Sequence, residues 1–141
     1  MYEVALKLKK IPIRNGASIN SVEDAIAYLK KKLADLPYEQ VGYILLKQEM
    51  VDSLIITSKG SKDSAPSNHA DMIKAALLTN STGVIMFHNH PSASETPSEA
   101  DVKVAKKVKE ALALFDLSLV DSIIIPAGGE TVTSLRKLGF I

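Results

Sequence analysis

The sequence predicts a single α/β domain in which a mixed central sheet is flanked by helices. Segments with a helical repeat of apolar residues alternate along the chain with short β-branched runs. The length of 141 residues suits one domain with a substantial core. Hydrophobic residues make up 46% of the chain and charged residues 23%, which is typical of globular proteins and excludes intrinsic disorder.

The first half of the chain predicts a strand, a helix and a hairpin, in that order. Residues 2–11 alternate apolar and polar side chains as a strand does. A helix is expected from about Ser21, whose side chain can cap it, with Asp24 in the first turn. Two apolar runs, at 41–46 and 51–57, then flank a polar turn, which predicts two strands joined as a hairpin.

The second half predicts helices that alternate with strands. In order, the expected elements are a loop at 59–68, a helix at 71–78, a strand at 83–87, a helix from near Pro97 to about Phe115, a buried strand at 117–125 and a short strand at 130–133. Thr96, Pro97 and Glu99 match the N-cap, N1 and N3 positions of a capping box, which predicts how the long helix starts. No internal repeat and no long linker divides the chain.

Composition excludes several classes of protein. The absence of cysteine excludes disulfide scaffolds, cysteine-ligated zinc and thiol nucleophiles. The 17 basic and 16 acidic residues nearly balance, and the sequence pI is near 7.9, so charge does not support direct nucleic-acid binding. No apolar run approaches the length of a membrane span, and the first residues lack the layout of a signal peptide. We therefore expect a cytoplasmic protein with no membrane association.

Two of the three histidines, His88 and His90, stand one residue apart at the end of a predicted strand. Residues i and i+2 of a strand project from the same face, so both imidazoles can reach one ion such as Zn²⁺. The apolar stripe of the next helix, projected back from Ala105, reaches Asp101. A carboxylate on the buried side of a helix is costly unless it is paired or binds a cation.

Each of these residues also has a purely structural interpretation. Asp101 lies near a helix N-terminus, where acidic residues are favoured, and the two histidines could be polar residues of a loop. Their combination at fixed spacing with Ser98 is rare by chance, on the order of one in several thousand for a chain of this length. The sequence therefore predicts a metal site formed by His88, His90 and Asp101.

Three protein ligands leave a fourth position for water, which is typical of catalytic rather than structural zinc. A hydrolase of this kind also needs a general base outside the ligand set. Ser98, three residues before Asp101, could hydrogen-bond a developing oxyanion. Spacing alone leaves four acidic candidates for the base: Glu39, Glu49, Asp52 and Asp71.

The spacing His88-x-His90, seven residues, Ser98, two residues and Asp101 resembles the JAMM signature of the JAB/MPN metalloprotease superfamily. The string HNHPS that begins at His88 resembles the RadC branch in particular, whose members are known as DNA repair proteins. The resemblance extends over roughly the whole chain. It implies a single RadC-like JAB/MPN domain over residues 1–141, with a cytidine-deaminase-like α/β/α fold and without the N-terminal helix-hairpin-helix region of longer members.

The resemblance also implies a function. One zinc ion per chain would be held by His88, His90 and Asp101. Glu39 matches the family's upstream catalytic glutamate and would act as general base, and Ser98 matches the motif serine that assists the oxyanion. The implied reaction is hydrolysis of an amide or isopeptide bond in a peptide substrate, in a context associated with DNA repair. The sequence does not name the oligomeric state and is compatible with an oligomer.

The sequence departs from the family pattern at two places. Ala93 stands where the family usually has glycine after HNHPS, which indicates a slightly different turn. His69, Ala70 and Asp71 stand where relatives carry Pro-Arg-Glu, so an arginine that could contact the substrate is missing.

Two other functions remain as alternatives. A metal-dependent nuclease or phosphodiesterase often uses two metals bridged by several carboxylates, whereas this motif supplies one. An aromatic content of 5% also provides little for stacking single-stranded nucleic acid. A non-catalytic MPN binding module is expected where the motif has been lost, and every motif residue is present here.

Overall fold

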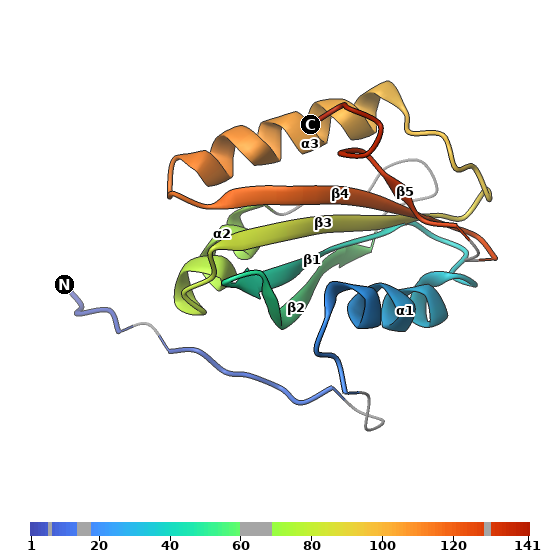
Figure 1. Cartoon of the computed structure of the whole chain (residues 1–141). Coiled ribbons are helices and arrows are strands. Elements are labelled where there is room, and N and C mark those ends of the chain that lie inside the picture. The colour runs from blue at the N-terminus through green and yellow to red at the C-terminus, as the bar shows by residue number, and fades with distance from the viewer. Residues whose placement is uncertain (6, 14–17, 60–68, 129–130) are drawn as a thin grey trace.

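A computed structural model of the chain describes residues 1–5, 7–13, 18–59, 69–128 and 131–141. The described residues form three helices and a mixed sheet of five strands, so the α/β class is confirmed (Figure 1). In chain order the elements are α1 (Val22–Leu33), β1 (Gln40–Lys47), β2 (Met50–Lys59), α2 (His69–Leu78), β3 (Gly83–His90), α3 (Glu99–Ala113), β4 (Ser118–Pro126) and β5 (Thr133–Ser134).

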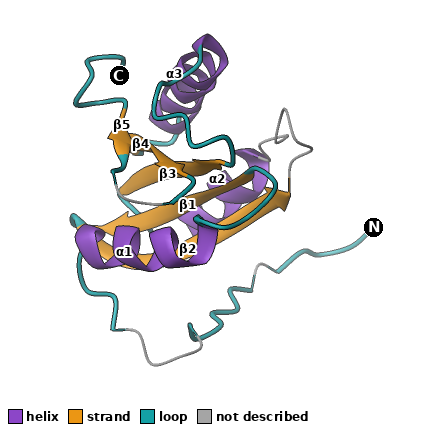
Figure 2. Ribbon diagram, turned by 90° about the vertical axis from the view of Figure 1, so that its right-hand side faces the viewer, coloured by secondary structure: helices purple, strands orange, loops and turns teal. Residues whose placement is uncertain are grey.

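The strand order in the sheet is β2-β1-β3-β4-β5. Strand β1 is antiparallel to both β2 and β3, whereas β3 and β4 run parallel, and β5 returns antiparallel to β4. The parallel pair requires a crossover connection, and α3 provides it. Helix α1 covers one face of the sheet, and α2 and α3 cover the other (Figure 2).

The central strands are buried on both faces, which explains why they appear in the sequence as continuous apolar runs. In β1, Tyr43 and Leu45 pack beneath α2 and α3, whereas Ile44 and Leu46 pack against α1. Strand β3 alternates in the same way. Because of this alternation, successive residues at the end of β3 point into opposite layers.

The strand predicted at residues 2–11 is wrong. The described part of this segment lies outside the sheet, and Tyr2 and Val4 are exposed (Figure 1). An alternating pattern forms a strand only where a ladder partner is available, and the described residues of this segment form no ladder. Instead, Nζ of Lys10 lies 3.1 Å from the carboxylate of Asp52 on β2.

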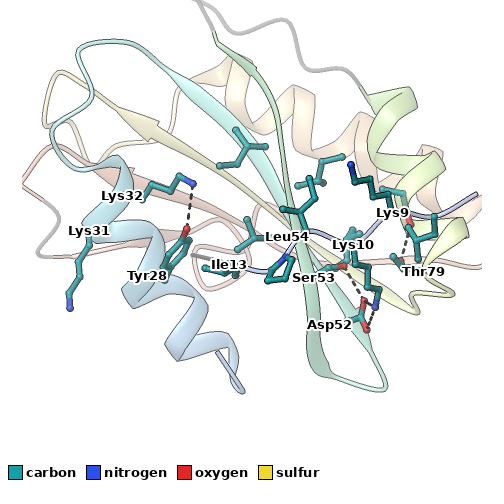
Figure 3. A pocket seen from close by; sticks show the side chains of 17 residues that line it. Lys9, Lys10, Ile13, Tyr28, Lys31, Lys32, Asp52, Ser53, Leu54 and Thr79 are labelled. Atoms are coloured by element: carbon teal, nitrogen blue, oxygen red, sulfur yellow. Dashed lines mark hydrogen bonds and ion pairs between the residues drawn. The ribbon is translucent and has the colours of Figure 1, made fainter. Parts of the chain in front are cut away.

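This N-terminal segment, β2 and α1 border a groove of about 1290 Å³ (Figure 3). Its lining includes the ion pair of Lys10 with Asp52 and the side chains of Tyr28 and Lys32, which are hydrogen-bonded to each other. None of the motif residues named above lines the groove.

Several boundaries differ from the expectation. The loop predicted at 59–68 lies outside the described residues, apart from Lys59, which ends β2. Strand β5 is Thr133–Ser134, and the first residue of the strand predicted at 130–133 is not described.

Of the helices in the described residues, none combines the length and the hydropathy required to cross a membrane.

Candidate metal centre

The two histidines stand at the end of β3, on the face that packs against α3. They continue the alternation of Val84 and Met86, which belong to the core beneath α2 and α3. His88 is buried, His90 is partly exposed, and their Nε2 atoms lie 3.1 Å apart. The predicted convergence of both imidazoles on one point is therefore observed.

The first turn of α3 brings Asp101 to the same point. Its Oδ1 lies 3.2 Å from Nε2 of His88, and its Oδ2 lies 3.4 Å from Nε2 of His90. Each of the three side chains offers a ligand atom within 4.8 Å of those of the other two. The sequence prediction of this cluster thus agrees with the geometry.

The start of α3 differs from the prediction. Ser98, and not Thr96, is the N-cap: its Oγ accepts a hydrogen bond from the backbone N–H of Asp101 at 3.1 Å. In return, Oδ2 of Asp101 accepts one from the backbone N–H of Ser98 at 2.7 Å. The pairs Thr96–Glu99 and Ser98–Asp101 both place an acid three residues after a hydroxyl, so the pattern alone could not distinguish the two registers.

The donor set, two imidazole nitrogens and a carboxylate, suits a metal ion such as zinc. The Nε2 atoms of the two histidines and Oδ1 of Asp101 are joined by separations of 3.1 and 3.2 Å, whereas the 3.4 Å contact of His90 is with the other oxygen, Oδ2. With one ligand atom from each residue, all three atoms lie within 4.8 Å of one another. The cluster could therefore hold a metal ion, with one coordination position left open.

A hydrogen bond fixes which nitrogen of His90 faces the cluster. Nδ1 of His90 lies 3.0 Å from the carbonyl oxygen of Ser94. Because a carbonyl only accepts hydrogen bonds, Nδ1 carries the proton and donates it. In the neutral ring the lone pair is then on Nε2, which is the atom that faces the other two ligands.

The electrostatics of the cluster follow from these contacts. Burial acts to raise the pKa of Asp101, but the hydrogen bonds with His88 and His90 outweigh it and hold that pKa well below its usual range. The hydrogen bond with Asp101 raises the pKa of His90 above its ordinary value, against the opposing effect of burial. Asp101 is therefore ionised at neutral pH, and a metal ion would compete with a proton at His90.

Glu39 lies beside the cluster and outside it. It precedes Val41 by two residues, and the cross-strand neighbour of Val41 is His88. By the two-residue period of a strand, Glu39 belongs to the same face of the sheet as the histidines. Its charge is one of the causes that raise the pKa of His90, although it is not in the group of three ligands. The role of Glu39 as general base remains a prediction.

The other three candidates for the base have different surroundings. Glu49 lies in the turn between β1 and β2, at the end of β1 remote from Gln40. Asp52 forms ion pairs with two lysines, including Lys47 at 3.3 Å. Asp71 lies on the first turn of α2 and pairs with a lysine at 3.4 Å.

Ser98 has a structural role in the cap, and that role leaves its hydroxyl proton free to donate. Its Oγ accepts from Asp101, but a hydroxyl can accept and donate at the same time. Its role toward an oxyanion remains a prediction.

Two residues of the site region were missed or underestimated by sequence reasoning. Asn89, between the histidines, is buried and hydrogen-bonds the backbone on both sides of Glu39. A polar side chain in an apolar run could have indicated such a role. Ala93 adopts φ of 59°, the left-handed conformation that favours glycine, so this turn keeps the backbone that a glycine would adopt.

Comparison with known proteins gives a family for this arrangement. A family model described as the RadC-like JAB domain matches residues 19–140. A UPF0758 protein of Shewanella amazonensis is 31% identical over 140 residues, which cover 99% of this chain and 61% of the relative. UPF0758 proteins of Marinobacter nauticus and Shewanella baltica are 31% and 30% identical, with 62% and 61% of their lengths covered.

The chain thus spans about three fifths of the length of these relatives. The match to the family model covers nearly all of the chain and includes every residue of the cluster and Glu39. This chain belongs to the RadC-like JAB domain family.

Proposed function

We propose that this protein is a zinc-dependent hydrolase that cleaves an amide or isopeptide bond in a peptide substrate. The observation that carries the proposal is the convergence of His88, His90 and Asp101, with separations of 3.1–3.4 Å, beside a glutamate outside the ligand set. Membership of the JAB family, in which such a site is expected, supports the same conclusion. The link to DNA repair is proposed only from the family resemblance, and a cytoplasmic location only from the sequence features described above.

Two of the three ligands, Asp101 and His90, are arranged as a metal site needs. Asp101 is ionised, and the Ser94 carbonyl holds the proton of His90 on Nδ1, away from the cluster. The third ligand, His88, is buried. A bound zinc ion supplies Lewis acidity, which lowers the pKa of a water molecule and polarises a carbonyl oxygen.

Glu39 then has the role of the base. It removes a proton from the attacking water and delivers that proton to the nitrogen of the leaving group as the C–N bond breaks. Ser98 donates its hydroxyl proton in a hydrogen bond to the carbonyl oxygen while negative charge develops there. One water molecule is consumed, and one carboxylate and one amine are released.

The test is turnover of peptide and isopeptide substrates by zinc-loaded protein, with Glu39→Gln beside the wild type. Removing a general base is expected to lower the rate by about 10²–10⁴-fold while the metal stays bound. Glu49→Gln, the same change in the β1–β2 turn, is the matched control and should keep full activity. Full activity of Glu39→Gln would overturn the assigned base. Plasmid or single-stranded DNA cleavage above that of Asp101→Asn would favour the phosphodiesterase alternative.

A further inference from the structure

We infer that Asn89 is a positioning residue that clamps the segment carrying Glu39 to the end of β3, between the two histidines. This inference rests on the proposed function, because it assigns how the base is held. It concerns the residue between the two histidines of the motif, whose side chain is directed away from the metal site.

The amide of Asn89 bonds to the backbone on both sides of Glu39. Its Oδ1 accepts a hydrogen bond from the backbone N–H of Gln40 at 2.7 Å, and its Nδ2 donates one to the carbonyl of Tyr38 at 2.9 Å. An N–H can only donate and a carbonyl can only accept, so the two partners also fix the orientation of the amide. Both peptide neighbours of Glu39 are thereby tied to one rigid side chain.

The register of the sheet explains why a side chain is used here. The ladder between β1 and β3 ends with the pair Val41 and His88. The next pair would be Gln40 and Asn89, and at that place the amide of Asn89 takes the position of the missing backbone rung. The side chain of Asn89 therefore continues the pairing of β3 with the chain beyond the ladder, through the backbone of Gln40 and of Tyr38 on either side of Glu39.

The burial of Asn89 indicates that these two hydrogen bonds account for a polar residue at this position. Only 2% of the residue is exposed, and it lies two residues after Phe87, which packs in the apolar layer beneath α1. An amide in such a layer is costly unless its polar atoms are paired. Asn89 pairs both of them with the one segment that carries the proposed base.

The alternation of side chains along β3 places the metal ligands on one face of the strand and the clamping residue on the other. His88 and His90 face α3, and Asn89, between them, faces the α1 layer. The contacts of Asn89 therefore do not involve the three ligand atoms. Loss of its amide should release the carboxylate of Glu39 from its fixed position while metal binding is unaffected.

Hydrogen exchange tests the clamp without any substrate. In the wild type the amide proton of Gln40 should exchange slowly, and Asn89→Ala should expose it selectively while Tyr43, further along β1, stays protected. Thr79→Val is the matched control, because it removes buried side-chain hydrogen bonds at the end of α2. Unchanged exchange at Gln40 in Asn89→Ala would overturn the clamp.

Double-mutant kinetics test the role in the reaction. We expect Asn89→Ala to lower kcat by about 10- to 100-fold with zinc stoichiometry unchanged. In a Glu39→Gln background the same change should have little further effect, because Asn89 acts through Glu39. Equal losses in both backgrounds, or loss of zinc, would overturn the positioning role.

Asn89→Asp keeps the protein testable if the alanine variant does not fold. It retains an acceptor for Gln40 and replaces the donor to Tyr38 with an oxygen, so it should weaken the clamp on one side only. It should lower kcat with zinc stoichiometry unchanged, while the Gln40 amide keeps its acceptor and its protection. Unchanged kcat in this variant would overturn the inference. Absence of all turnover in the wild type would overturn the hydrolase and the role of Asn89 in it, whereas the exchange result would still decide whether the clamp exists.

Discussion

Asp101 accepts a hydrogen bond from the backbone N–H of Ser98 at 2.7 Å, and the same carboxylate lies against both histidines of β3. One side chain therefore caps α3 and completes the candidate metal centre. The helix start and the site are coupled, so a change in one is expected to disturb the other.

Replacing Asp101 should lower the stability of the protein by more than the loss of a helix-capping bond alone. In metal-free protein, Asp101→Ala is expected to lower the free energy of unfolding by about 2 kcal/mol, because the capping box loses the bond from the Ser98 backbone N–H and buried His88 loses its partner. Helix α1 has an equivalent capping box formed by Ser21 and Asp24, without a histidine cluster, so Asp24→Ala measures the cap alone. Chemical denaturation with a chelator present compares the two. Equal losses would contradict the coupling.

The raised pKa of His90 predicts opposite effects of pH on the metal-free and metal-loaded protein. Protonated His90 stabilises the metal-free fold, so this stability is fully present below about pH 6.5 and is lost as pH rises through the raised pKa. Zinc must displace that proton, so zinc affinity should fall as pH falls through the same range. Thermal unfolding with and without zinc from pH 5.5 to 9 checks both signs. Stability of the metal-free protein that increases through this interval would refute the assignment, and His90→Asn should abolish the dependence.

The turn after β3 offers a stabilising substitution. Ala93 adopts φ of 59°, where a Cβ is strained by about 1–2 kcal/mol and glycine is not. Ala93→Gly should therefore raise the free energy of unfolding by roughly 0.5–1 kcal/mol after the cost in unfolded-chain entropy. The control is Ala27→Gly on the exposed side of α1, which should destabilise by about 1 kcal/mol. Urea titration of both variants measures the difference, and a destabilised Ala93→Gly would disprove it.

Gly42 on β1 allows the close packing of the sheet near the site. A Cβ at this position would overlap the ring of Phe87 and lie 2.6 Å from the carbonyl oxygen of Ile55. Gly42→Ala is therefore expected to destabilise the protein by about 1–3 kcal/mol through overpacking. Adding Phe87→Leu should recover part of the loss, as measured by denaturation of the single and double variants. No recovery would assign the cost to the β2 backbone instead.

The sequence was most informative where the periodicity of a single element decides the geometry. The two-residue period of a strand is sufficient to bring His88 and His90 together. The helical stripe through Ala105 is sufficient to place Asp101 on the inner side of α3, although the predicted helix start was wrong. A stripe depends on spacing along the helix and does not depend on where the helix begins.

Sequence reasoning reached its limit where separate elements meet. Glu39 is adjacent to the cluster only because β1 pairs with β3, and spacing along the chain contains no information on that register. The bonds of Asn89 depend on the same pairing. The strand prediction at residues 2–11 was wrong for a related reason. An alternating pattern predicts a strand, but it does not provide the neighbouring strand with which to pair.

The amount of zinc bound by untagged protein is the most direct test of the metal centre. Elemental mass spectrometry of purified wild type, before and after incubation with zinc, should find about one ion per chain. The Asp101→Asn variant should bind none, because the only carboxylate of the cluster has lost its charge while the amide oxygen can still cap α3. A wild-type protein that takes up no zinc, or an Asp101→Asn variant that retains a full equivalent, would contradict the account.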